Sequence, residues 1–251
     1  MKGVILAGGS GSRLYPLTRI TNKHLLPVFN QPMIYYPIQL LVEAGIDRIL
    51  IVTGGNHAGE FLPLLGNGSA FGLKHLDYTF QERPAGIADA LALARHFVSG
   101  DDVCVLLADN IFEFSIRPTV DAFKGQQGGA RILLANVDQP QHYGVPVFRD
   151  GRLERIEEKP PHPASPYAVT GCYLYDNRVF DDVGNLEPSA RGELEITDVN
   201  NAYLRRGRLE YDIVDGYWAD CGESFESLLR ANRLVAERGA SKMATIAPST
   251  G

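Results

Sequence analysis

The sequence predicts an α/β fold in which a mostly parallel central sheet is covered by helices on both faces. In the first half of the chain, short runs that are apolar throughout alternate with helical patterns, as at residues 48–53 (RILIVT) and 102–108 (DVCVLLA). Such strands are typical of parallel sheets that are buried on both faces. Later in the chain, Asp150-Gly151 separates two short segments and predicts a β-hairpin, so we expect a small antiparallel insert.

The first half is expected to alternate strands with helices. Residues 32–44 fit a helix, because Pro32 suits a first turn, Gly45 follows the last residue, and apolar side chains share one face. The remaining expected elements are strands at 3–6, 48–53, 76–80, 102–108 and 130–137, a glycine loop at 8–11, and helices at 57–65 and 86–97.

The second half is expected to carry the antiparallel insert and two further helices. Paired strands are predicted at 143–149 and 152–157, followed by a proline-rich stretch and a strand at 167–175. Helical patterns return at 195–206 and 224–237, and the small, polar tail from Gly239 is expected to fray. No internal repeat and no linker-like boundary interrupts the chain, which favours one α/β domain.

Composition and charge narrow the classes of function. The 251 residues are 45% hydrophobic and 22% charged, as in an ordinary globular domain. Lys and Arg number 24 against 30 Asp and Glu, which gives a formal charge of −6. No segment gathers a basic stripe, so we expect no nucleic-acid partner. A few local Arg and Lys side chains are still enough to bind a small anion.

Two features bear on the compartment. The N-terminal apolar run covers only residues 4–7, which is too short for a signal peptide, and no run is long enough to predict a membrane span. Cys104, Cys172 and Cys221 lie far apart and form no CxxC motif, as expected of reduced thiols. We therefore expect a cytoplasmic protein without a membrane partner.

Residues 6–13 (LAGGSGSR) place a glycine-rich loop directly after the first expected strand. Glycines let backbone N–H groups approach an anion closely, because no Cβ stands in the way. Arg13 can hold phosphate oxygens in a fork, and Lys23 adds a second cation. The loop is therefore a candidate phosphate site, and a tight turn with two solvated cations is the alternative. It matches neither a full dinucleotide fingerprint nor a Walker A loop.

Asp109 and Asp220 each follow an apolar segment that is predicted to be extended. A carboxylate at the carboxyl end of a parallel strand suits Mg²⁺, because Mg²⁺ bound to phosphates takes only one or two protein carboxylates. An Asx-turn or a helix cap explains an isolated Asp equally well. In the same way Lys159, which closes the hairpin, belongs either to a solvated face or to a ligand site.

Other common kinds of active site are not indicated. The six histidines contain no pair at metal-binding spacing, and no GxSxG or Cys/His pattern suggests a nucleophile. A dinucleotide-dependent oxidoreductase needs an acidic residue ~20 positions after the glycine loop. The first acidic residue after the loop is Glu43, which lies farther on and inside an expected helix.

Several longer segments stand out together: LAGGSGSRLYPLT, NKHLLPVFNQPMIYYPIQLL, ADNIF, EEKP, YAVTGCYLYDN, EPSARGELEITDVNNAYL and WADCGESFESLL. They resemble the sugar-nucleotide pyrophosphorylases, a nucleotidyltransferase family, and most closely its thymidylyltransferase branch. The resemblance runs from Lys2 to about Arg233. It implies a Rossmann-like nucleotidyltransferase fold and the Mg²⁺-dependent condensation of a nucleoside triphosphate with a hexose 1-phosphate, which releases pyrophosphate.

The resemblance also implies roles for individual residues. Arg13 and Lys23 would act on the reacting phosphates, and Asp109 and Asp220 would bind the metal. The residues implied for the nucleotide are Leu6, Gly8, Gly9, Gly11, Arg13, Gln81, Pro84 and Gly86, and those for the sugar phosphate are Asn110, Tyr143, Gly144, Glu158, Lys159, Val169, Gly171 and Tyr173.

The expected substrates are dTTP and glucose 1-phosphate, with UTP or another hexose 1-phosphate as the alternative. A sugar-nucleotide-binding protein without catalysis is less favoured, because both cations and both aspartates are present. We expect one domain at 1–238, with a nucleotide-binding part at about 1–135, a sugar-binding part at about 136–222 and a tail at 239–251. Longer family members continue with helices that contribute to an effector site and to subunit contacts, so feedback regulation and a homo-oligomer are left open.

Overall fold

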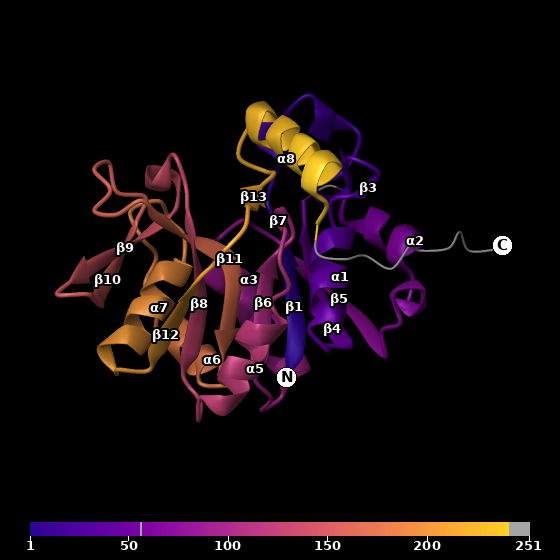
Figure 1. The fold of residues 1–251 in the computed structure, drawn as a ribbon. Coiled ribbons are helices and arrows are strands. Elements are labelled where there is room, and N and C mark those ends of the chain that lie inside the picture. Colours follow the sequence, from indigo (N-terminus) through magenta and orange to yellow (C-terminus); the bar gives the residue numbers. More distant parts are fainter. Residues whose placement is uncertain (56, 241–251) are drawn as a thin grey trace.

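The computed structural model describes residues 1–55 and 57–240, and within them seven strands form one central sheet (Figure 1). The strand order is β12-β8-β11-β6-β1-β4-β5. All neighbours pair in parallel except β11, which is antiparallel to β6 and β8. The strands are β1 (Lys2–Ala7), β4 (Arg48–Gly54), β5 (His75–Gln81), β6 (Val103–Leu107), β8 (Ala130–Asn136), β11 (Tyr167–Tyr175) and β12 (Leu209–Ile213).

The sheet is apolar on both faces, which explains why its central strands read as uninterrupted apolar runs. Along β1, Val4 and Leu6 enter the core on one face, while Ile5 and Ala7 enter the core on the other. Successive side chains of a strand point to opposite faces, so a strand covered on both sides needs apolar residues at every position. The expected mostly parallel sheet with helices on both faces is confirmed.

The two faces are covered by different helices. On one face lie α3 (Ile87–Ala92), α4 (Arg95–Val98), α6 (Val179–Gly184) and α7 (Ile196–Arg205), and on the other lie α1 (Tyr35–Glu43), α2 (Phe61–Leu65) and α5 (Arg117–Gly125). The last helix, α8 (Phe225–Arg238), packs with β2 and β13 above the carboxyl end of the sheet (Figure 1).

Three of the expected helices differ from the helices in the structure. The helix expected at 32–44 begins only at Tyr35, and Pro32 belongs instead to the short strand β3 (Gln31–Pro32). Pro37 then falls in the first turn, where no backbone N–H is needed. The helix expected at 86–97 divides into α3 and α4. The segment expected to be helical at 57–65 is a 3₁₀ turn followed by α2.

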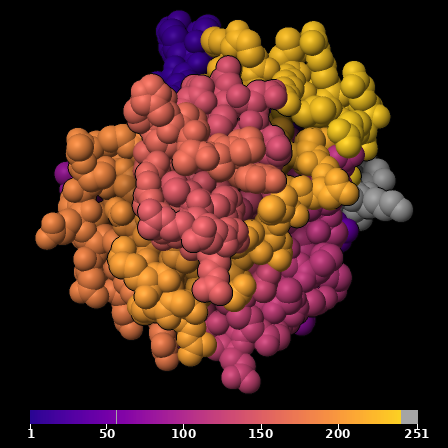
Figure 2. All heavy atoms as spheres, turned by 60° about the vertical axis from the view of Figure 1, so that its left-hand side comes forward, coloured from indigo at the N-terminus to yellow at the C-terminus, as the bar shows by residue number. Residues whose placement is uncertain are grey.

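The antiparallel insert is a hairpin of β9 (Gly144–Arg149) and β10 (Arg152–Glu158), as the Asp150-Gly151 turn predicts. It projects from the edge of the molecule and, in Figure 2, its residues occupy the middle of the face that is turned forward. The strand expected after the proline-rich stretch is β11, which enters the central sheet instead of extending the insert.

Two small sheets escaped the sequence analysis: β7 (Asn110–Phe112) with β13 (Trp218–Asp220), and β2 (Pro27–Val28) with β3. Each of these strands has only two or three residues, too few to show a period. Single-turn 3₁₀ helices complete the elements: η1 (Ser12–Leu14), η2 (Leu17–Arg19), η3 (Lys23–Leu25), η4 (Ala58–Glu60), η5 (Ser69–Phe71) and η6 (Pro140–His142).

The tail expected at 239–251 lies outside the described residues from position 241 onward. In the part of the chain that the structure covers, no helix is long and apolar enough to cross a membrane. Cys104, Cys172 and Cys221 are buried and unbridged, as expected.

A buried hydrogen bond between β11 and α7 provides a test of the core. The hydroxyl of Tyr175 donates to Oδ1 of Asn200 over 2.6 Å, and both side chains are fully buried. Tyr175→Phe leaves the amide oxygen without this donor, so we expect a loss of about 1–3 kcal/mol in the free energy of unfolding. Thermal or urea unfolding measures the loss. The control is Tyr78→Phe, which removes an exposed hydrogen bond to Gly66, and an equal loss in both variants would contradict the argument.

Candidate active site

The ends of parallel strands bring three polar segments together at one edge of the sheet. Ala7 of β1 lies opposite Thr53 of β4, and Leu6 lies opposite Leu107 of β6, so the three strands end at nearly the same level. The glycine loop, Gly54-Gly55 and Asp109-Asn110 therefore begin side by side. Ligands in such sheets bind at this edge.

The glycine loop packs closely against its neighbours. A Cβ at Gly54 would come within 3.3 Å of both the Gly8 Cα and the backbone oxygen of Gln81. Gly9 and Gly11 adopt positive φ angles of 96° and 64°, a conformation that favours glycine. Leu6 is buried, and its carbonyl accepts a hydrogen bond from Ala108 at 3.0 Å. Close approach and left-handed backbone explain the glycines at these positions.

The residues expected around the nucleotide base lie beside this loop. Gln81 ends β5, and a Cβ at Gly8 would lie 2.7 Å from its Oε1. Its amide donates to Asp89 at 2.7 Å. Gly86 has a φ of 104° and packs against the backbone of Leu194 so tightly that no side chain fits there. Pro84 is exposed in the loop between Gln81 and Gly86.

A buried ion pair lies next to the glycine loop. Lys23 Nζ is 2.5 Å from Oδ2 of Asp109, and both side chains are largely shielded from solvent. Burial opposes the charge on each, but their mutual attraction outweighs it, so the pKa of Lys23 is raised and that of Asp109 is lowered. His24 lies 4.0 Å from Asp109, and burial together with Lys23 lowers the pKa of His24 to about 3. The site therefore holds a charged Lys–Asp pair beside a neutral imidazole.

Asp220 is brought to this pair by β13, which pairs with β7 so that Asp220 faces Asn110. The backbone N–H of Cys221 donates to the carbonyl of Asp109 at 2.8 Å. A Cβ at Gly222 would collide with the Asp109 carboxylate, so this turn requires glycine. Burial and the nearby charge of Asp109 raise the pKa of Asp220 to about 7.

These two carboxylates fit a divalent cation. Lys23 is 2.5 Å from Asp109, and burial together with the charge of Asp109 raises the pKa of Asp220, so a further positive charge beside these carboxylates would be favourable. Over residues 1–55 and 57–240, no cluster of three or more His, Cys, Asp or Glu side chains forms a full protein cage. Mg²⁺ needs no such cage, because it keeps water ligands and binds substrate phosphates.

A cavity of 160 Å³ opens beside the aspartates. It lies between the end of the hairpin, β11 and the start of α7, and its lining includes Arg13 and Asp220. All eight residues expected around the sugar phosphate line this one cavity: Asn110, Tyr143, Gly144, Glu158, Lys159, Val169, Gly171 and Tyr173.

Asn110 connects the cavity to the carboxylates. Its Oδ1 accepts hydrogen bonds from the Gly171 backbone at 2.9 Å and from Trp218 Nε1 at 2.6 Å. Its Nδ2 donates to Asp109 at 3.0 Å. A Cβ at Gly171 would collide with Asn110, so glycine permits this contact. One amide side chain thus joins β11, β13 and the end of β6.

The hairpin ends at two charged residues that reach the cavity. Glu158 accepts a hydrogen bond from the Thr197 hydroxyl at 2.5 Å and pairs with Arg191 at 3.2 Å. Lys159 has a positive φ of 46°, which is strained for a residue other than glycine, and its N–H donates to Tyr143 at 3.0 Å. Strain of this kind is common at ligand sites. Lys159 lines the cavity and is at the same time exposed to solvent.

The sequence analysis missed several residues of the cavity wall. Trp218, the single tryptophan of the chain, packs its ring edge-on against Tyr143 with 5.0 Å between ring centroids. Its uniqueness and its place two residues before Asp220 were the available signals. Other wall residues to which the sequence analysis gave no role are His142, Arg191, Glu195, Thr197 and Glu223. All of these except His142 lie within the motif segments quoted above, so their membership of those segments was the available signal.

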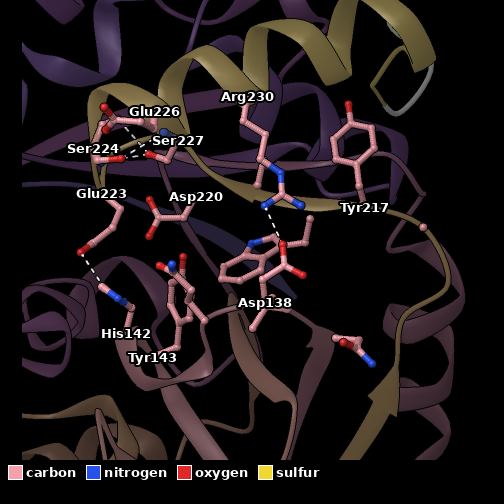
Figure 3. A pocket seen from close by; sticks show the side chains of 16 residues that line it. Asp138, His142, Tyr143, Tyr217, Asp220, Glu223, Ser224, Glu226, Ser227 and Arg230 are labelled. Carbon is pink, nitrogen blue, oxygen red and sulfur yellow. Dashed lines mark hydrogen bonds and ion pairs between the residues drawn. The ribbon is translucent and has the colours of Figure 1, made fainter. Parts of the chain in front are cut away.

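A second cavity of 360 Å³ is lined by residues of the β13 segment and of the start of α8, and also by Tyr143 and Trp218 (Figure 3). It shares His142, Asp220 and Glu223 with the first cavity. Figure 3 shows the Glu223 carboxylate directed at His142, and across the cavity Arg230 of α8 directed at Asp138.

Known proteins are similar to this chain over most of its length. The family model described as nucleotidyl transferase matches residues 2–238. A glucose-1-phosphate thymidylyltransferase of Neisseria meningitidis is 46% identical over 94% of this chain and 82% of its own length. One from Actinoplanes sp. is 47% identical over 88% of this chain and 74% of its own length.

Solved structures agree. A Bacillus anthracis protein provisionally named a glucose-1-phosphate thymidylyltransferase, solved with sucrose, has a TM-score of 0.90 and 51% identity over 94% of this chain and 96% of its own. A UDP-glucose pyrophosphorylase complexed with UDP-glucose has a TM-score of 0.80 at 21% identity, over 94% and 98% of the two chains, which supports the fold alone. The expected Rossmann-like nucleotidyltransferase fold is confirmed. The chain belongs to the nucleotidyl transferase family.

Proposed function

We propose that this protein is a glucose-1-phosphate thymidylyltransferase, which condenses dTTP with glucose 1-phosphate to form dTDP-glucose and pyrophosphate. The observation that carries the proposal is the meeting of Arg13, Lys23, Asp109 and Asp220 beside a cavity that contains all the residues expected around the sugar phosphate. Relatives of that name are 46% and 47% identical to the chain, which supports the same substrates.

The parts of the site divide between the two substrates. We assign the triphosphate to the glycine loop, where Gly8, Gly9 and Gly11 leave the backbone open and Arg13 and Lys23 add positive charge. We assign the nucleotide base to Gln81, Pro84 and Gly86, which lie at the adjoining end of β5, next to Leu6. The glucose 1-phosphate occupies the 160 Å³ cavity, with Lys159 at its phosphate. In this division residues 1–135 bind the nucleotide and 136–222 the sugar, within one domain over 1–238.

The chemistry requires no general base. The phosphate oxygen of glucose 1-phosphate is anionic at neutral pH and attacks the α-phosphorus of dTTP in line with the departing pyrophosphate. The obstacle is to hold two polyanions together and to stabilise charge on the transferred and leaving phosphates. Arg13, Lys23 and Lys159 supply fixed positive charge at this place. Preorganised charge of this kind is often the largest contribution to catalysis.

Mg²⁺ is the cofactor that the site suits, with Asp109 and Asp220 as its protein ligands. When bound, the ion supplies charge neutralisation at the phosphates and orients them. The protein's own contribution is to join the two segments that carry these carboxylates by the hydrogen bond from the Cys221 N–H to the Asp109 carbonyl, and to keep Lys23 2.5 Å from Asp109. Since the three cysteines are buried and unbridged, we also propose a reducing, cytoplasmic setting.

The substrate assignment is tested by pyrophosphate release with a panel of dTTP, UTP, glucose 1-phosphate and other hexose 1-phosphates. We expect the highest kcat/KM with dTTP and glucose 1-phosphate. A preference for UTP would support the same reaction on a different base. Binding of a sugar nucleotide without any pyrophosphate release would instead support a non-catalytic protein and overturn the proposal.

Arg13 is expected to act mainly in the transition state. Arg13→Ala should therefore lower kcat by about 10²-fold or more, as for the loss of one preorganised donor. Steady-state kinetics with both substrates measures the effect. The matched control is Arg48→Ala, an exposed arginine at the opposite end of the sheet, which should retain normal kcat. A normal kcat in Arg13→Ala would remove this role.

Metal dependence is expected to run through Asp220. Chelation with EDTA should abolish pyrophosphate release, and added Mg²⁺ should restore it. Asp220→Asn should raise the Mg²⁺ concentration needed for half-maximal activity by about tenfold or more. Even residues that only orient the ligands of a metal change its affinity by this much when they are mutated. The control is Asp77→Asn on the exposed edge of β5. An unchanged Mg²⁺ requirement in Asp220→Asn would contradict its role as a ligand.

A further inference from the structure

Glu223 makes two ionic contacts at the boundary between the two cavities. Its Oε2 lies 2.6 Å from Nη1 of Arg13, and its Oε1 lies 3.3 Å from Nδ1 of His142. The contact with His142 is seen from the side of the larger cavity in Figure 3. Both carboxylate oxygens therefore have a partner, and each partner comes from a different segment.

The three residues join parts of the molecule that are far apart in the sequence. Arg13 lies in η1 after the glycine loop, His142 ends η6 just before the hairpin, and Glu223 lies between β13 and α8. Arg13, His142 and Glu223 all line the 160 Å³ cavity. The side chain of Glu223 thus connects the proposed nucleotide-binding and sugar-binding parts across the opening of the site.

The backbone around Glu223 is held by hydrogen bonds on both sides. Before it, the N–H of Gly222 donates to Asp220 at 2.9 Å. After it, Ser224 caps α8 and forms a reciprocal capping box with Ser227. Glu223 therefore has a fixed place relative to the Asp220 carboxylate.

Arg13 has the more exposed side chain of the two partners. Its side chain is 58% exposed, while that of Glu223 is 25% exposed. Immobilising a long side chain of this kind costs conformational entropy. An exposed ion pair adds little to stability, so the contact matters here for where it places the guanidinium. Glu223 accepts from Nη1 of Arg13, and a guanidinium has five N–H donors, so others can meet phosphate oxygens while this contact is kept.

We propose that Glu223 is a positioning residue for Arg13, which it holds at the junction of the glycine loop and the sugar-phosphate cavity, ready for the reacting phosphates. The inference rests on the proposed function, because it assumes that Arg13 acts on those phosphates. The opposing interpretation is that Glu223 masks Arg13 and competes with the triphosphate. The two interpretations predict different kinetic effects of removing Glu223. Loss of a positioning residue lowers kcat, whereas loss of a mask lowers the KM for the nucleotide.

A double-mutant cycle in pyrophosphate release tests the proposal. We expect Glu223→Ala to lower kcat by about tenfold or more, because small misplacements of a catalytic group are costly. In the Arg13→Ala background the same change should alter kcat by less than about twofold, since its effect runs through Arg13. The control is Glu226→Ala, which removes an equal charge three residues further along the chain and should leave kcat unchanged.

A second measurement does not depend on activity. In ¹⁵N–¹H spectra of arginine side chains, the Arg13 signal is assigned by its loss in Arg13→Ala. We expect slow rotation of its guanidinium in the ligand-free wild type and in Glu226→Ala, and fast rotation in Glu223→Ala. Equal mobility in all three proteins, an unchanged kcat in Glu223→Ala, or a lowered nucleotide KM with normal kcat would overturn the proposal. A wild type with an ordered Arg13 but no pyrophosphate release would overturn the proposed function instead.

Discussion

The buried ion pair of Lys23 and Asp109 is the contact on which the candidate site depends. A carboxylate buried at the end of β6 is unstable without a compensating charge, and Lys23 provides it at 2.5 Å. The same Asp109 receives an N–H from Asn110 through its side chain, and from Cys221 through its backbone oxygen. The η3 segment that carries Lys23, the end of β6 and the β13 segment therefore meet at one residue.

Close backbone packing makes this convergence geometrically feasible. Gly222 and Gly171 occur where a single extra carbon would collide with Asp109 or with Asn110. Gly8 similarly leaves room for Gln81 at the end of β5. The glycines at the site thus serve two purposes: in the loop they allow left-handed backbone, and at the later positions they allow side chains of other strands to approach.

The balance of charge in the ligand-free site suits a reaction between two anions. Lys23 is paired with Asp109, Arg13 with Glu223, and the pKa of Asp220 is raised to about 7 by burial and by Asp109. Lys23 and Arg13 each have an acidic partner, whereas burial and the charge of Asp109 disfavour the charged form of Asp220. A divalent cation together with substrate phosphates would complete the balance. The site therefore combines preorganised positive charge with two carboxylates that suit a divalent cation.

The local sequence determined most of the secondary structure and the chemical character of the site. Apolar runs specified β1, β4 and β6, Asp150-Gly151 specified the hairpin, and the motif strings pointed to Arg13, Lys23 and both aspartates, because these features depend on near neighbours in the chain. Helix ends were less certain, as at Tyr35, since Pro32 and Pro37 are each compatible with a first turn.

Only the tertiary structure decided that β11 runs antiparallel within the central sheet and that the three-residue strand β13 places Asp220 and Trp218 beside β7. It also decided the Arg13–Glu223 and Glu158–Arg191 pairs. Such contacts join residues that are tens to hundreds of positions apart, and they follow from packing and strand register, which no local pattern encodes.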